Sequence, residues 1–154
     1  MYKLWKKGPL PTTAEAREQH LVDGLPGYAA LVELRRLHAE DSVLYGLYVE
    51  HLRHHAPGRF LGDAFGPQAF DRVIEYLGDG EGLYRELRSM DACHLLVRSS
   101  AGHMGAASWS MPEGPDYERR FRRVPHAGEA PHPVTGETFE LYALQGFECP
   151  LPVQ

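Results

Sequence analysis

The sequence is poor in cysteine and has no long hydrophobic run. Its only two cysteines, Cys93 and Cys149, do not form a CxxC pair, so the chain is not a small disulfide-stapled scaffold. No segment approaches the roughly 20 consecutive apolar residues of a membrane-spanning helix. The charged start, residues 1–9, is followed by no apolar stretch that would make it a signal peptide. The net charge of -5 lacks the basic excess of nucleic-acid binders. A free-standing chain is therefore expected to be soluble, unexported and cytoplasmic, with no nucleic-acid partner.

The length and composition fit one ordinary domain. The 154 residues, 43% of them hydrophobic, are enough to bury a core without disulfides or structural metals. Prolines at positions 9 and 11 predict an extended lead-in over residues 1–12. We expect a single domain over residues 13–146, which includes a long loop region at 99–136 rich in glycine and proline, and a C-terminal tail over residues 147–154.

Apolar spacing and capping residues predict several short helices. Thr13 is a suitable N-cap for a first helix that runs to about Val22. The i, i+3, i+4, i+7 pattern of Phe70, Val73, Ile74 and Leu77 indicates one buried helix face. Further helices are expected over residues 28–38, 50–56, 81–90 and 116–123.

Four segments have the patterns of β-strands. Residues 42–49 and 92–97 are almost continuously apolar, as in strands buried on both faces, and Cys93 is read as a small core residue. Residues 59–63 form a brief candidate strand. Residues 138–144 alternate in polarity, which predicts a half-exposed edge strand. Alternating strands and helices predict a small three-layer α/β sandwich with a short, largely parallel, Rossmann-like sheet and a long irregular insertion before the edge strand.

Two histidines suggest a possible metal site. His51 and His55 lie four residues apart, so on an α-helix they would share a face and could hold one ion. The HExxH pattern is absent because Leu52 follows His51, and no third ligand is evident. A solvated histidine-rich surface is the preferred interpretation, with no cofactor, and a histidine-based metal-binding module is kept as an alternative.

A second alternative is a small enzyme or ligand-binding protein. Parallel sheets bind ligands at the carboxyl ends of their strands, where Ser100, His103 and Asp63 are expected. A hydroxyl and a histidine there could act as nucleophile and base. The GxSxG pattern is absent, so the preferred interpretation is an ordinary loop with no catalytic residue.

One dense cationic cluster stands out in the acidic chain. It consists of Arg119, Arg120, Arg122 and Arg123. Arginine suits phosphate and anionic lipid headgroups. The alternative is a solvated helix balanced by neighbouring acidic residues, and the sequence leaves both interpretations open.

Eight short segments, taken in order, carry a resemblance to a known family. They are residues 17–21, 25–28, 43–48, 58–63, 65–67, 83–87, 94–97 and 140–144. Together they resemble the soluble C-terminal tail of bacterial GT-C-fold membrane glycosyltransferases, of the protein-mannosyltransferase-like type that depends on polyprenyl phosphate. The likeness rests on the order and spacing of the segments and covers roughly residues 10–144.

The resemblance implies a non-catalytic accessory domain. In such enzymes the sugar donor is a lipid-linked phosphosugar, and the catalytic acidic residue lies in the membrane portion, so no catalytic residue is carried over to this chain. The implied partners are that membrane portion or anionic and polyprenyl lipid headgroups. Attached to its membrane part, the domain would lie on the extracytoplasmic face.

Overall fold

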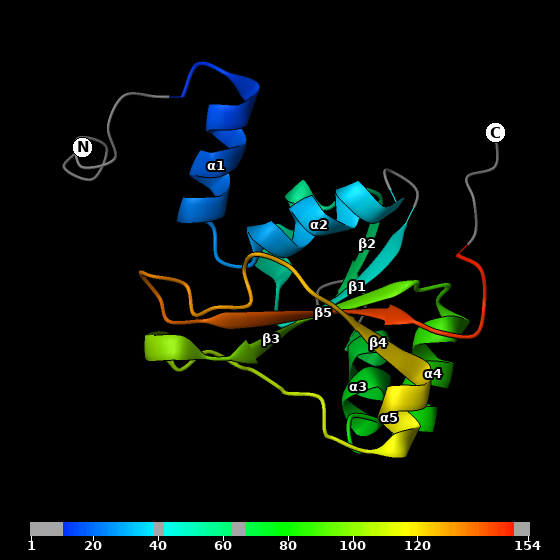
Figure 1. The fold of residues 1–154 in the computed structure, drawn as a ribbon. Helices are drawn as coiled ribbons and strands as arrows, with labels where there is room; N and C mark the ends of the chain where they lie inside the picture. The colour runs from blue at the N-terminus through cyan, green and yellow to red at the C-terminus, as the bar shows by residue number, and fades with distance from the viewer. Residues whose placement is uncertain (1–10, 39–41, 63–66, 150–154) are drawn as a thin grey trace.

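The computed structural model describes residues 11–38, 42–62 and 67–149, which form an α/β domain (Figure 1). The elements along the chain are α1 (Ala14–Gly24), α2 (Tyr28–His38), β1 (Val43–Leu47), the 3-10 helix η3 (Glu50–His55), β2 (Arg59–Gly62), α3 (Pro67–Glu75), α4 (Gly80–Ser89), β3 (His94–Ser100), the 3-10 helix η4 (Gly102–Met104), α5 (Pro115–Arg120), β4 (Phe121–Val124) and β5 (Thr138–Leu144). Among the described residues, no helix combines the length and hydropathy needed to cross a bilayer.

The five strands form one mixed sheet in the order β2-β1-β3-β5-β4. Strand β1 pairs in parallel with β2 and with β3. Strand β5 pairs antiparallel with β3 and with β4. The predicted α/β class is confirmed, and the sheet is parallel only across β2, β1 and β3.

Strand β5 is an interior strand, which corrects the prediction of an edge strand. Its alternating residues pack on both faces of the sheet: Phe139 and Leu141 in one core, and Tyr142 and Leu144 in the other. The edge on this side of the sheet is β4, which overlaps the end of the segment predicted to be a helix over residues 116–123. The helix α5 ends at Arg120. From Phe121 on, the chain is extended and pairs with β5, which buries the Phe121 and Val124 side chains.

Helices lie on both faces of the sheet. Helix α2 and η3 cover one face, where Leu31, Leu34 and Leu52 are fully buried. Helices α3, α4 and α5 cover the other face, where Val73 and Leu83 are fully buried (Figure 1).

Local signals account for where two helices begin. The Thr13 hydroxyl caps α1 by accepting a hydrogen bond from the backbone N–H of Ala16 at 3.1 Å, as the sequence predicts. The Asp79 carboxylate caps α4 through the N–H of Gly82 at 3.1 Å. None of the residues of α1 is fully buried, and Leu21 and Val22 pack partly buried against the core.

Candidate functional site

The structure places two of the three residues predicted for a nucleophile-and-base site, Ser100 and His103. The Ser100 hydroxyl accepts a hydrogen bond from the N–H of Gly102 at 3.3 Å. The exposed His103 ring lies against Gly136, and its backbone N–H donates to the Thr135 carbonyl at 2.9 Å. Asp63 lies outside the described residues. No hydrogen bond joins Ser100 to His103 in the described structure, and the catalytic role stays a prediction.

His51 and His55 lie in η3, which is a 3-10 helix. With about three residues per turn, residues four apart no longer share a face. His51 Nε2 donates to the Pro26 carbonyl at 2.9 Å, and the His55 ring packs edge-on against Tyr28 at 5.5 Å between centroids. Within residues 11–38, 42–62 and 67–149, no three histidine, cysteine or carboxylate side chains gather as metal ligands do.

Half of the arginine cluster is bound to one carboxylate of α4. Glu81 accepts hydrogen bonds from Arg119 and from Arg120, the latter at 2.8 Å from Nε. The bond from Arg120 is the largest cause that lowers the pKa of Glu81, to about 2, and the bond from Arg119 is the next. Arg120 also lies over the Tyr84 ring at 4.6 Å. These two cations are therefore compensated within the protein.

The other half lies on edge strand β4. Arg123 is paired with Glu129 at 3.2 Å and with Glu140 at 3.4 Å. Arg122 is exposed, and its guanidinium has no partner in the part of the chain that the structure describes. Among the described residues, Arg122 is thus the one member of the four-arginine cluster without a carboxylate partner.

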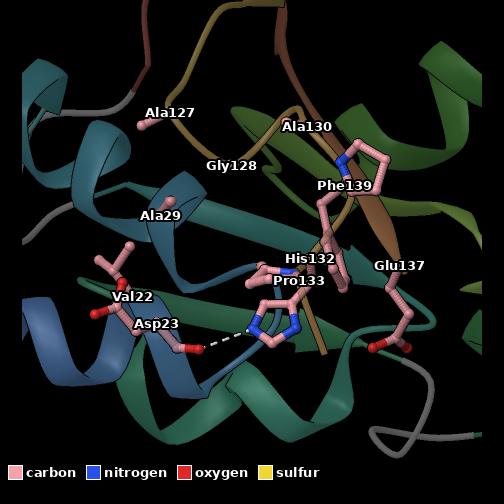
Figure 2. Close-up of a pocket in the computed structure, with 12 residues that line it drawn as sticks. Val22, Asp23, Ala29, Ala127, Gly128, Ala130, His132, Pro133, Glu137 and Phe139 are labelled. Atoms are coloured by element: carbon pink, nitrogen blue, oxygen red, sulfur yellow. Dashed lines mark hydrogen bonds between the residues drawn. The ribbon is translucent and has the colours of Figure 1, made fainter. Parts of the chain in front are cut away.

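The structure also contains a cavity that the sequence does not reveal. It has a volume of about 190 Å³ and lies between the α1–α2 turn and the connection from β4 to β5 (Figure 2). Most of its lining residues are small or apolar: Val22, Gly27, Ala29, Ala127, Gly128, Ala130, Pro131, Pro133 and Phe139. Its walls come from two distant parts of the chain, residues 22–29 and 127–139, so no local motif could have predicted it.

A few polar groups complete the cavity wall. Glu137 is almost fully buried and is paired with Arg98, with 2.9 Å between Oε1 and Nε. His132 Nε2 donates to the Asp23 carbonyl at 3.0 Å, the dashed line in Figure 2. This bond joins residues 109 positions apart in the sequence and closes one side of the cavity.

Cys93 and Cys149 form a disulfide with 5.5 Å between their Cα atoms. The bond attaches the C-terminal segment to the start of β3. Two further contacts hold this segment: the Tyr84 hydroxyl donates to the Gln145 carbonyl at 2.6 Å, and Arg88 lies over the Phe147 ring. The interpretation of Cys93 as only a small core residue was therefore incomplete. Two cysteines without a motif spacing gave no signal for the pairing.

Comparison with protein-family models identifies the family of the chain. The family model described as SF2091/S2213 matches residues 16–131, which is most of the chain. No curated protein matches, and no solved structure matches.

Proposed function

The chain belongs to the SF2091/S2213 family, and we propose that it is a non-catalytic accessory domain like the soluble tail of a membrane glycosyltransferase that uses lipid-linked sugars. The Cys93–Cys149 disulfide is the observation that carries this proposal. Disulfides form and persist in oxidising compartments outside the cytosol. The extracytoplasmic face of the membrane, where the resembled tails lie, is such a compartment, so the bonded cysteines favour that location over the cytoplasm.

The arrangement of the fold supports the same role. Helices on both faces of one sheet are consistent with the three-layer, Rossmann-like description. Of the predicted catalytic groups, the Ser100 hydroxyl is engaged with the backbone N–H of Gly102. No described contact favours the enzyme or the metal-binding module over an accessory role.

The free edge of β4 is the surface we assign to anionic headgroups. Arg122 has no carboxylate partner within the described ranges, and Arg119 and Arg123 keep more than half of their side chains exposed while they bind carboxylates. Guanidinium groups bind phosphate through paired hydrogen bonds, and each cation near an anionic surface contributes about 1 kcal/mol.

Vesicle flotation tests this surface. The purified chain is expected to float with vesicles of phosphatidylcholine and phosphatidylglycerol and with vesicles that contain polyprenyl phosphate, but not with phosphatidylcholine alone. Arg122→Glu reverses one charge and is expected to weaken binding about tenfold or more, as the loss of about 2 kcal/mol implies. Binding should weaken further with salt.

Arg59→Glu is the matched control. Arg59 is also exposed and lies on β2, the edge strand at the opposite side of the sheet. It should float like the unmodified chain. Equal losses in the two variants, or no flotation of the unmodified chain, would exclude a headgroup surface on β4.

A further inference from the structure

The connection from β4 to β5, residues 125–137, closes one side of the cavity. We propose that this connection, called the flap below, opens in acid because His126 and His132 hold it shut only in their neutral form. This behaviour is independent of the accessory role proposed above.

The bonding partners of His132 fix its neutral form. Its Nε2 donates to the Asp23 carbonyl, because a carbonyl oxygen only accepts. Its Nδ1 lies 3.3 Å from the backbone N–H groups of Val134 and Thr135, which only donate. Protonation would add a hydrogen to Nδ1. This nitrogen could then no longer accept from the backbone N–H groups of Val134 and Thr135 and would face them as a donor.

His126 shows the same arrangement. Its Nε2 donates to the Phe139 carbonyl at 3.2 Å, and its Nδ1 accepts from the N–H of Gly128 at 3.1 Å. Burial lowers the pKa of His126 below its ordinary value of 6.5, and the nearby Glu129 partly opposes this effect.

The charges around the two histidines come from several elements. Glu129 of the flap, Arg123 of β4 and Glu33 of α2 act on His126. Asp23 and Glu137 share the cavity lining with His132.

Two ion pairs reduce the effect of the nearby carboxylates on the histidines. Arg98 of β3 pairs with Glu137, and Arg123 pairs with Glu129. A further titratable group near the α1–α2 turn is His51 of η3, which donates to the Pro26 carbonyl. Glu137 and Glu129 therefore already have cationic partners in the closed flap, whereas the Asp23 carboxylate accepts a hydrogen bond from the Gln19 amide at 2.8 Å.

The direction of the pH effect follows from the bonds that protonation breaks. In the open flap His126 loses the burial that lowers its pKa, so it takes up a proton more readily than in the closed flap. In the closed flap the acceptor role of Nδ1 disfavours the proton. The open form therefore binds more protons, and opening becomes more favourable as the pH falls below about 6.5. Opening would expose the apolar lining at Val22, Ala29 and Phe139.

Hydrogen exchange measured by NMR tests the flap in the unmodified chain. The amides of Gly128, Val134 and Thr135 donate to the histidines, so they report directly on closure. Between pH 7.5 and pH 5.5 their protection, corrected for intrinsic exchange, is expected to fall about tenfold or more. Amides within β3 should keep their protection, which separates flap opening from global unfolding.

The double variant His126→Asn, His132→Asn removes the titration but keeps an acceptor. An asparagine side-chain oxygen accepts from the amide two residues on, as in an Asx turn. The three reporter amides should then have the same protection at both pH values. His54→Asn, a change at an exposed position of η3, should leave the pH response of the unmodified chain intact.

Three results would overturn the proposal. One is unchanged protection at pH 5.5 although the imidazole signals show protonated His126 and His132. Another is loss of protection in parallel with the β3 amides. The third is a folded double variant that responds to pH as the unmodified chain does.

Discussion

Replacing Cys149 with serine is expected to lower the free energy of unfolding by about 2–4 kcal/mol. The disulfide joins residues 56 positions apart, so it removes many conformations from the unfolded chain. Cys149 is the better position to change, because Cys93 is buried and its replacement would also disturb the core. Urea unfolding under non-reducing conditions measures the difference.

Reduction provides the matched control for this prediction. In a reducing buffer the unmodified chain should lose the same stability, and Cys149→Ser should not change further. Equal stability of the oxidised chain and the variant would show that the disulfide does not constrain the unfolded state.

Replacing Glu137 with alanine is expected to destabilise the fold by about 3–5 kcal/mol. The Glu137 and Arg98 side chains are only 8% and 14% exposed, so the change leaves a buried guanidinium without its counter-charge. The ion pair lacks a well-aligned hydrogen bond at Arg98 Nε, so attraction between the charges carries most of the interaction. Chemical denaturation at neutral pH measures the loss.

A double variant tests whether the loss comes from leaving one buried charge unpaired. Arg98→Met combined with Glu137→Leu removes both charges and should recover most of the lost stability. Glu18→Ala is the control, because Glu18 pairs with Arg35 at 3.3 Å where both side chains are far more exposed. It should cost about 0–1 kcal/mol. A loss for Glu137→Ala as small as that for Glu18→Ala would contradict the burial argument.

The sequence predicts the elements that depend on local patterns. Thr13 caps α1, the apolar run at residues 42–49 contains β1, and the run at 92–97 covers the first part of β3, which continues to Ser100. These predictions succeed because capping and continuous hydrophobicity act over a few residues.

The edge of the sheet depends on pairing that local patterns do not encode. In β4 the buried residues Phe121 and Val124 are separated by two exposed arginines, a spacing that also fits a helix. Strand β5 alternates like a half-exposed strand, yet it is interior because β4 covers its outer side. The antiparallel pairing of β4 with β5 makes β4 the edge strand and β5 an interior strand.

In the candidate sites too, local patterns identify residues, while contacts between distant segments determine their roles. The sequence singles out the arginine cluster, but ion pairs with Glu81, Glu129 and Glu140 decide which charge stays available. The bond between His132 and Asp23 joins distant segments, and so does the disulfide. Such contacts form only when the whole chain folds.

The state and location of the two cysteines test the proposed accessory role most directly. In cells that carry the native chain, free thiols would be blocked with a maleimide, disulfides reduced, and the released thiols tagged by mass. Intact spheroplasts would be treated with external protease in parallel. We predict that Cys93 and Cys149 are tagged only after reduction and that the protease digests the chain. Cysteines blocked in the first step, in a chain protected from the protease, would place it in the cytosol and contradict the extracytoplasmic role.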